Sequence, residues 1–238
     1  MKPKIKSISF VIPAYQESAA IAKVIRELRL ECSRVGYKFE ILLVDDGSSD
    51  NTAQKAGLAG AKVIGHAYNR GYGASLKTGI IQASNEIIII MDADGQHFPG
   101  DIPRFIETFR RTGVSALVGN RMADQGGMPL VRKLTNIFMS WYLSRQMGQH
   151  VPDTQCGYRL YAAQILPYLA TESSRYAAES ETLLRAAAQN IKIGSVPIKV
   201  IYRDEKSKIR PFRDTIRFFA MVRRFKKEIK AEQNSRKR

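Results

Sequence analysis

The sequence has too few cysteines for a disulfide-stabilised protein, and its apolar runs are too short for a signal peptide or a membrane-spanning helix. Its two cysteines, Cys32 and Cys156, cannot form a disulfide framework, which favours a reducing compartment such as the cytoplasm. The N-terminal residues contain no apolar stretch as long as a signal peptide. The most apolar run, residues 87–91, has the length of a strand and not of a membrane-spanning helix. We therefore expect a cytoplasmic chain with no spanning segment.

Two common nucleotide-binding motifs are also missing. No G-x-x-x-x-G-K-[ST] phosphate loop is present. The glycine-rich residues 69–73 lack G-x-G-x-x-G and follow only a weak predicted strand. These absences weaken the ATPase and dehydrogenase interpretations. Without repeats or low-complexity linkers, 238 residues suffice for one α/β domain with a hydrophobic core.

The charge is strongly basic and unevenly distributed. The net charge is +16, and residues 203–238, with 14 basic and 5 acidic residues, carry 9 of these charges. Such an excess suits anionic lipids, phosphorylated substrates or nucleic acid. The last of these predicts salt-sensitive binding to DNA or RNA.

Apolar runs alternate with helical patterns along the chain. Strands are predicted at residues 8–12, 39–44, 62–65, 87–91, 115–118 and 198–202. Helices are predicted between them, one of them capped by Ser18 and another over residues 102–111. This alternation predicts an α/β fold with a doubly wound, mainly parallel sheet between two layers of helices.

A polar cluster follows most of the predicted strands. Ligands bind at the carboxyl edge of open α/β sheets, so one crevice should bring together Tyr15, Asp45, Asp46, Asp92, Asp94 and Arg121. Asp92 and Asp94 follow an all-apolar strand, and such carboxylates suit Mg²⁺ or Mn²⁺ carrying a diphosphate. An acidic turn is the simpler alternative. The pair Asp45 and Asp46 fits either a turn or a site for a base or ribose, since Gly47 permits close backbone approach.

Several segments resemble the motifs of glycosyltransferase family 2, whose members have the GT-A fold. They are residues 10–17 (FVIPAYQE), 44–50 (VDDGSSD) and 91–99 (MDADGQHFP). Residues 119–121 (GNR), 153–159 (DTQCGYR) and 207–209 (SKI) narrow the resemblance to the polyprenyl-phosphate or dolichyl-phosphate mannose and glucose synthases. The match runs from about residue 8 to residue 209. It implies a GT-A, Rossmann-like domain over residues 1–210. Residues 211–238 are predicted, from their own residue pattern, to form a basic amphipathic helix and tail.

The resemblance implies a role for each matching residue. The donor, GDP-mannose or UDP-glucose, would be bound by Pro13, Tyr15, Glu17, Asp45, Asp46, Asp92, Ala93, Arg121, Arg203 and Lys208. Asp94 and Gln96 would ligate the metal. Asp94, Arg121 and Asp153 would act at the reacting groups, with Arg121 on the sugar or diphosphate. Asp153 stands where relatives that attack hydroxyls keep a general base. Because a phosphate acceptor is already ionised, we assign Asp153 to positioning of the acceptor or sugar.

Basic residues in two loops are candidates for the acceptor. Arg203, Lys206 and Lys208 form a predicted loop after residues 198–202, and Arg132 follows a Gly-Gly-Met-Pro loop. We assign Arg132 and Lys206 to the acceptor, with a solvated charge run as the alternative for the later loop. Cys156 is expected to be packed and not a nucleophile.

The C-terminal residues predict a surface helix. Between residues 212 and 230, apolar side chains recur at steps of three and four: Phe212, Ile216, Phe219, Val222, Phe225 and Ile229. With arginines and lysines between them, this pattern favours a helix lying on an anionic membrane. The alternative is a stripe that packs on the domain. Residues 134–143 could be a second contact or an ordinary core face.

Together these features predict a metal-dependent, inverting hexosyltransferase at the cytosolic face of a membrane, acting on polyprenyl or dolichyl phosphate. The same fold could instead serve a glycan or small-molecule hydroxyl. Nucleic-acid binding is disfavoured by the acidic crevice, and a non-catalytic lipid-binding protein would bind neither nucleotide nor metal. A membrane-anchoring subunit is a further possible partner.

Overall fold

Seven strands form one mixed sheet in the part of the chain that the computed structural model describes, residues 5–123, 128–169, 171, 177–199, 201 and 211–235. Their order across the sheet is β3-β2-β1-β4-β6-β5-β7, and only β6 runs antiparallel to its neighbours. The strands are β1 (Ser7–Ala14), β2 (Lys38–Asp45), β3 (Lys62–Gly65), β4 (Ile87–Ile90), β5 (Ala116–Asn120), β6 (Arg159–Ala162) and β7 (Ile193–Pro197).

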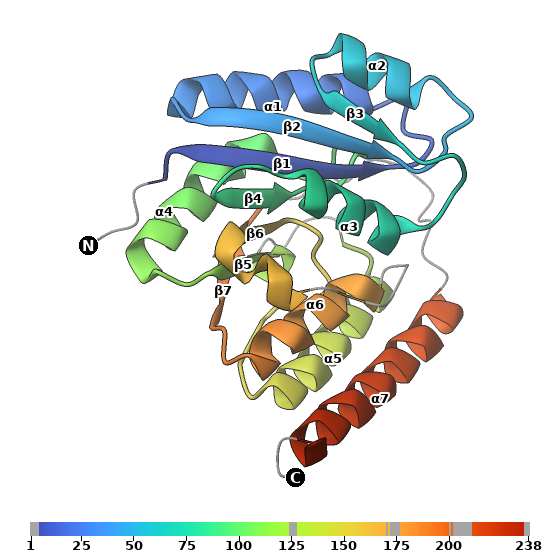
Figure 1. The fold of residues 1–238 in the computed structure, drawn as a ribbon, viewed down its shortest axis with the longest axis vertical. Helices are drawn as coiled ribbons and strands as arrows, with labels where there is room; N and C mark the ends of the chain where they lie inside the picture. The colour runs from blue at the N-terminus through green and yellow to red at the C-terminus, as the bar shows by residue number, and fades with distance from the viewer. Residues whose placement is uncertain are drawn as a thin grey trace.

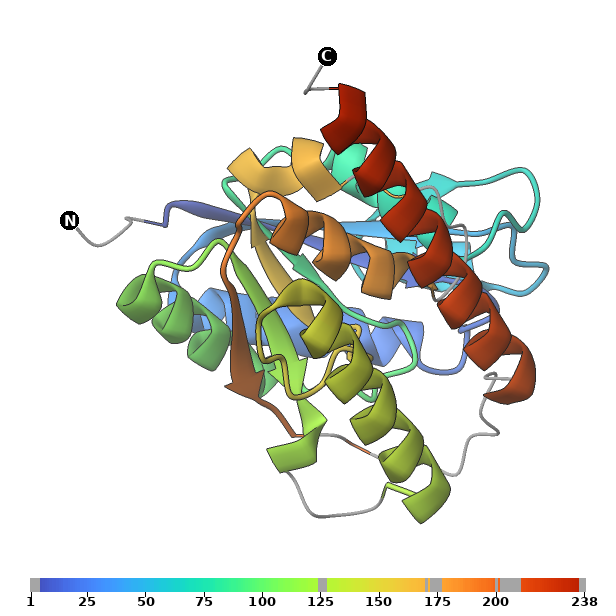
Figure 2. The same cartoon turned by 90° about the horizontal axis from the view of Figure 1, so that it is seen from below.

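Helices cover both faces of this sheet. They are α1 (Ile21–Val35), α2 (Thr52–Leu58), α3 (Tyr72–Gln82), α4 (Ile102–Thr112), α5 (Leu130–Met147), α6 (Ala177–Ala188) and α7 (Pro211–Ser235). Short 3-10 helices span Pro99–Asp101, Arg121–Ala123 and Ala163–Leu169. α1 and α4 lie on one face, whereas α3 and α6 lie on the other (Figures 1 and 2). The predicted layered α/β fold is therefore confirmed.

The apolar runs form the centre of the sheet because both of its faces are covered. Phe10, Val11 and Ile12 of β1 are fully buried, as are Ile88 and Ile89 of β4. Continuous apolar strands of this kind are typical of parallel sheets between helices. The register aligns Ala14 with Asp45 and Val11 with Ile90, so these strands end at one edge.

Two sequence predictions were wrong in their placement. The last strand is β7, and residues 198–202 do not continue it where the structure describes them. Instead the N–H of Lys199 donates to Asp101 Oδ2 at 2.8 Å, and that of Ile201 to the Gln96 carbonyl at 3.1 Å. Ser18 is not a helix cap, because α1 begins after Ala20 and the Ser18 N–H donates to Asp50 Oδ2.

The helix α7 packs partly on the domain. Its described buried apolar side chains are Phe218, Met221, Val222 and Phe225, whereas Ile216 and Phe219 are exposed. This buried face is rotated from the predicted stripe because α7 packs against α6, where Arg224 Nη2 lies 2.9 Å from Glu181 Oε2. The side chain of Phe212 lies outside the described set. No helix in the described ranges combines the length and apolarity needed to span a bilayer.

Candidate active site

The polar residues predicted from the strand ends do meet at one edge of the sheet. Asp92 follows β4, Asp45 ends β2, and Arg121 follows β5. Because β6 is antiparallel, its first residue, Arg159, pairs with Ile90 at the end of β4 and with Val118 of β5. The loop before β6 therefore reaches the same edge as the carboxyl ends of the parallel strands.

Asp92 and Glu179 converge on one glycine in that loop. A Cβ placed on Gly157 would lie 2.9 Å from Glu179 Oε1 and 3.0 Å from each Asp92 carboxylate oxygen. The hydroxyl of Tyr72 donates to Glu179 Oε1 at 2.9 Å and lies 3.5 Å from Asp92 Oδ1. Only glycine leaves room for this approach of two carboxyl groups and a phenol.

Burial makes this carboxyl pair hard to ionise. Loss of solvation raises the pKa of Glu179 to about 7, against the opposing attraction of Arg159, and the nearby Asp92 raises it further. Burial also raises the pKa of Asp92, although the charges of Arg121 and Arg159 oppose the rise. Of the two carboxyl groups, Glu179 is therefore the one whose pKa is brought close to neutral pH.

Arg159 holds the backbone beneath the pair. It is almost fully buried and donates to the carbonyl oxygens of Thr154 at 3.0 Å, Cys156 at 2.8 Å and Glu179 at 2.6 Å. Arg159 lies in residues 153–159, one of the segments that resemble the family motifs, but the sequence did not predict that it would bind these backbone carbonyl groups. Tyr72 and Glu179 were missed altogether, because a tyrosine in a glycine-rich loop and a glutamate in a helix carry no local signal.

The turn after β4 presents Asp94 and Gln96. Both side chains are half-buried, and the Gln96 N–H donates to Asp94 Oδ1 at 2.9 Å across Gly95, whose φ is +75°. His97 lies beneath, stacked on Tyr158. Its Nδ1 accepts the Asp92 N–H at 3.0 Å, and burial lowers its pKa to about 4. This histidine is therefore neutral, carries its proton on Nε2 and supports the turn.

Arg121 and Asp153 form a buried ion pair. Arg121 Nε donates to Asp153 Oδ2 at 2.7 Å and Nη2 donates to Oδ1 at 2.8 Å. The pair fixes the guanidinium at the end of β5, beside the carboxyl cluster. The sequence analysis assigned both Arg121 and Asp153 to the reacting groups. In the structure these two side chains are bound to each other.

The carboxylates of Asp46 and Asp45 have different hydrogen-bond partners. Asp46 Oδ1 accepts from the Arg70 N–H and contacts His66 Nδ1 at 2.7 Å, while Oδ2 accepts from the Gly71 N–H. These contacts tie the β2 turn to the start of α3. The described contact of the Asp45 carboxylate is with the Ser48 hydroxyl.

The loop after β1 is tied to the loop after β2. The N–H groups of Gln16 and Glu17 donate to the hydroxyls of Ser48 and Thr52. Pro13 is buried in β1, Ala93 is buried after β4, and Tyr15 is exposed at the rim. These hydrogen bonds hold together the two loops, before α1 and before α2, that contain predicted nucleotide-sugar-binding residues. We call this part of the site the rigid corner.

Some predicted residues lie elsewhere or outside the described residues. Arg203, Lys206 and Lys208 fall outside them. Arg132 is half-buried in the first turn of α5. Cys156 is fully buried, as expected, and burial raises its pKa to about 12. In the described ranges no three His, Cys, Asp or Glu side chains cluster as a ready-made metal site.

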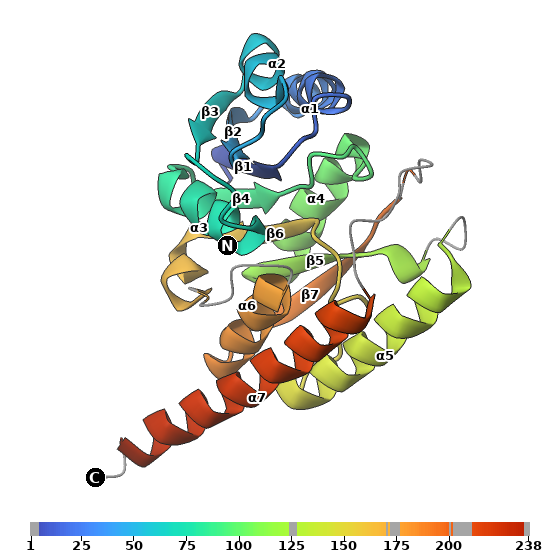
Figure 3. The same cartoon turned by 90° about the vertical axis from the view of Figure 1, so that its right-hand side faces the viewer.

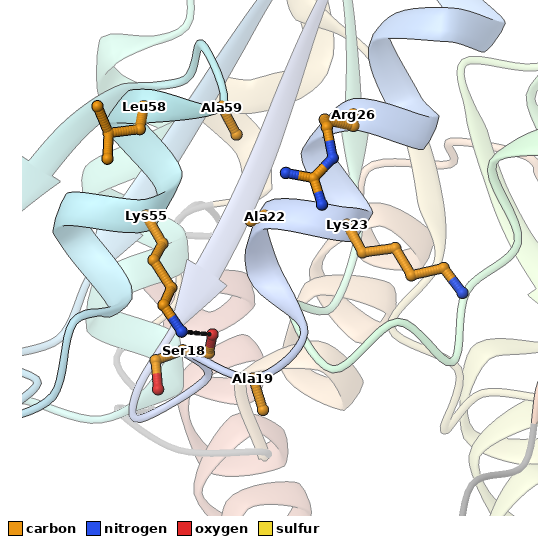
Figure 4. A pocket seen from close by; sticks show the side chains of 8 residues that line it. All are labelled: Ser18, Ala19, Ala22, Lys23, Arg26, Lys55, Leu58 and Ala59. Carbon is orange, nitrogen blue, oxygen red and sulfur yellow. Dashed lines mark hydrogen bonds between the residues drawn. The ribbon is translucent and has the colours of Figure 1, made fainter.

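A separate groove of about 510 Å³ lies between α1 and α2 (Figure 4). Ser18, Lys23, Arg26 and Lys55 line it together with small and apolar residues, and the Lys55 ammonium donates to the Ser18 carbonyl at 2.9 Å. None of the predicted site residues lines this groove, so we do not assign the site to it.

Comparison with known proteins agrees with the sequence motifs. The model of the family described as glycosyl transferase family 2 matches residues 9–168. An uncharacterized protein of Methanocaldococcus jannaschii is 35% identical over 205 residues, which cover 83% of this chain and 82% of that protein. The UDP-N-acetylglucosamine–dolichyl-phosphate N-acetylglucosaminyltransferase of Methanococcus voltae is 32% identical over 225 residues, covering 84% of this chain and 87% of its own.

Two further comparisons concern a longer relative and the fold. The undecaprenyl-phosphate 4-deoxy-4-formamido-L-arabinose transferase of Pseudomonas fluorescens is 34% identical over 70% of this chain, which spans only 50% of that protein. Glucosyl-3-phosphoglycerate synthase from Mycobacterium tuberculosis, solved with Mn²⁺, UDP and phosphoglyceric acid, superposes with a TM-score of 0.72 at 19% identity. That superposition covers 91% of this chain and 77% of the synthase. The fold is therefore GT-A, as predicted.

Proposed function

Because the chain belongs to glycosyltransferase family 2, we propose that it transfers a hexose from a nucleotide sugar to a polyprenyl or dolichyl phosphate at a membrane surface. The observation that carries the transfer step is the convergence of Asp92, Asp94 and Arg121 at one sheet edge. The named acceptors of two relatives, dolichyl phosphate and undecaprenyl phosphate, support the lipid acceptor. Mannose and glucose are the sugars favoured by the sequence motifs, while the relatives' names add N-acetylglucosamine to the candidates.

The residues of the turn after β4 fit a divalent cation. Asp94 and Gln96 offer a carboxylate and an amide oxygen from adjoining half-buried positions, and hard oxygen donors suit Mg²⁺ or Mn²⁺. Two protein ligands are enough when a diphosphate and water supply the rest. When bound there, the cation would offset the negative charge that grows on the departing diphosphate.

The remaining residues position the donor. A phosphate oxygen of the acceptor attacks the anomeric carbon, and the bond from that carbon to the nucleoside diphosphate breaks with inversion. Arg121, held rigid by Asp153, supplies a fixed positive charge for the diphosphate or sugar. Pro13, Tyr15, Glu17 and Asp45 form the rigid corner for the nucleotide. The acceptor phosphate needs no base, since it is ionised near neutral pH.

The test is glycolipid formation from a panel of donors. Polyprenyl phosphate in detergent, Mg²⁺ or Mn²⁺, and GDP-mannose, UDP-glucose or UDP-N-acetylglucosamine are incubated with the protein. We expect turnover with one donor, loss of turnover on adding EDTA, and restoration by excess metal. A polyprenol and a free glycan serve as hydroxyl acceptors. Turnover with only these hydroxyl acceptors would contradict a lipid-phosphate acceptor and favour the alternative in which the sugar is transferred to a hydroxyl group.

An Asp94→Ala variant tests the metal assignment separately. We expect at least a hundredfold loss of turnover and loss of metal-dependent nucleotide binding, with an unchanged melting temperature because Asp94 lies in a half-buried turn. Asp101→Ala, which removes the buried acceptor of the Lys199 N–H and of the Arg104 guanidinium, is the control for a general loss of structure. Full activity of Asp94→Ala would remove Asp94 from the metal site.

A further inference from the structure

The outward face of α5 is apolar, whereas an ordinary surface helix presents polar residues to solvent. Its outward side chains are between 45% and 76% exposed: Leu130, Val131, Leu134, Ile137, Phe138 and Trp141. The inward face combines apolar Met139, Leu143 and Met147 with polar Asn136 and Ser140. Ser140 Oγ accepts the Thr154 N–H at 2.9 Å. The outward residues recur at steps of one, three and four, so they form one continuous stripe along the helix.

The stripe continues onto α7. Tyr142 of α5 meets Phe219 of α7 edge-on, with 5.3 Å between ring centroids. Phe219 and Ile216 are exposed near the start of α7. We call the six exposed α5 residues together with Ile216 and Phe219 the docking face. Figure 3 shows α5 and α7 running along the same side of the molecule, away from α1 and α2.

The surroundings of the docking face are basic. Residues 125–152 contain no aspartate or glutamate, and α5 itself carries Arg132, Lys133 and Arg145. Among the α7 side chains that the structure describes, the exposed basic ones are Arg217, Arg223, Lys226 and Lys227. A second copy of this chain is a poor match for such a face, because a symmetric contact would oppose like charges.

The docking face begins close to the candidate active site. Arg121 follows β5 at the carboxyl edge, and α5 starts at Leu130, a short way along the chain. In Figure 2 the end of β5 and the start of α5 lie at the same end of the molecule. A membrane at this face would therefore meet the edge that holds the carboxyl cluster.

We propose that the docking face inserts into the headgroup region of an anionic bilayer, with α5 in the plane of the membrane. Exposed Leu, Ile, Phe and Trp enter the interface, while the flanking arginines and lysines meet anionic headgroups. α5, and not the α7 stripe predicted from the sequence, is the main inserted helix. The choice of a lipid surface rests on the proposed lipid acceptor, but binding itself requires neither donor nor turnover.

The single tryptophan of the chain makes this testable. Because Trp141 lies in the docking face, its fluorescence reports on that face alone. Vesicles of phosphatidylcholine with phosphatidylglycerol should shift its emission to shorter wavelength, and lipids brominated near the headgroup should quench it. Vesicles of phosphatidylcholine alone should bind at least tenfold more weakly, and this difference should shrink as salt is raised.

Matched variants separate this face from general hydrophobicity. Leu134→Gln/Ile137→Gln should reduce partition into anionic vesicles at least tenfold. Leu30→Gln/Leu58→Gln, at comparably exposed leucines of α1 and α2, should leave it unchanged. Since all four side chains are exposed, melting temperatures should stay close to that of the wild type.

Three outcomes would overturn the proposal. They are unchanged Trp141 emission with anionic vesicles at low salt, co-sedimentation without any Trp141 shift, and a concentration-dependent dimer that Leu134→Gln/Ile137→Gln abolishes while vesicles bind neither protein. Binding only to vesicles that contain a membrane protein would assign the face to a subunit instead. Turnover in detergent is measured in parallel, so failure of membrane docking is distinguishable from failure of the proposed transferase activity.

Discussion

The carboxylate of Asp153 accepts three hydrogen bonds from one residue, Arg121: two from its side chain and a third from its backbone N–H at 3.1 Å. A longer hydrogen bond comes from the Gln155 N–H at 3.3 Å. Asp153 is fully buried, and the guanidinium is nearly so. Burial alone would lower the pKa of Arg121, but the hydrogen bonds that it donates to Asp153 raise it. A carboxylate bound in this way acts through the arginine that it orients.

Removing Asp153 should therefore cost stability as well as activity. We expect Asp153→Ala to lower the free energy of unfolding by about 3–5 kcal/mol, because it leaves the Arg121 charge buried without a partner. Urea denaturation measures this loss. The paired Arg121→Met/Asp153→Leu variant should be closer to wild type in stability, although inactive. A loss below about 1 kcal/mol in Asp153→Ala would contradict the buried-pair account.

Glu179 should make stability and activity depend on pH near 7. Burial raises its pKa from 4.5 to about 7, so the folded protein favours the protonated form. The stability from this group is present below about pH 4.5 and is lost as pH rises through 7. The loss is on the order of 2–3 kcal/mol. Glu179→Gln keeps an acceptor for Tyr72 and should remove this dependence in urea denaturation at pH 5 and pH 8.

The activity of the same variant distinguishes a role in the site from a purely structural one. We expect Glu179→Gln to remove an inflection near pH 7 from the pH profile of kcat/KM, because it removes the carboxyl group whose pKa lies near 7. Glu107→Gln, an exposed glutamate of α4, is the control. An unchanged profile in Glu179→Gln would exclude the carboxyl pair from the reaction.

Asp45 and Asp46 should separate into a nucleotide-binding residue and a structural one. We expect Asp46→Ala to cost about 2 kcal/mol of unfolding free energy, because the N–H groups of Arg70 and Gly71 lose their acceptor. Asp45→Asn should lower nucleotide affinity about tenfold, the value of one charge-assisted hydrogen bond, with little loss of stability. Titration calorimetry and urea denaturation on both variants measure the two effects. If Asp46 were the nucleotide-binding residue instead, Asp46→Ala would bind nucleotide weakly without losing stability.

Both cysteines should resist thiol reagents. Burial raises the pKa of Cys32 and of Cys156 to about 12. At pH 8 the thiolate is then about one part in ten thousand. We expect labelling by a disulfide reagent to proceed only at the rate of unfolding, and to reach two thiols per chain in denaturant. Rapid labelling of one thiol in the native protein would contradict the burial of that cysteine.

The buried parallel strands could be predicted because their sequence is apolar without interruption. Residues 87–91 and 8–12 lie in β4 and β1 within one or two residues of the prediction. The last strand could not be placed, because the segment Ile193–Pro197 contains Gly and Ser while residues 198–202 are more apolar. Pairing with β5 decided the strand, and pairing is a tertiary contact that local composition does not encode.

The site residues that follow strands could be predicted from the sequence, whereas those contributed by helices distant in the sequence could not. Asp92, Asp94 and Arg121 follow strands, and the carboxyl-edge rule places them together. Glu179 reaches the cluster from α6, so only the folded chain brings it to Asp92. Ile137, Phe138 and Trp141 of α5 were compatible with a core face or a lipid contact, and their exposure decides against the core.

The insertion of β6 between β4 and β5 also sets an order of assembly during synthesis. The half-sheet β3-β2-β1-β4 is complete once residue 90 has left the ribosome. β5 pairs only with β6 and β7, so it has no strand partner until residues 159–162 have been made. Through that interval its apolar residues Leu117 and Val118 have no neighbouring strand, and a stalled or truncated chain of this length would be a natural substrate for chaperones.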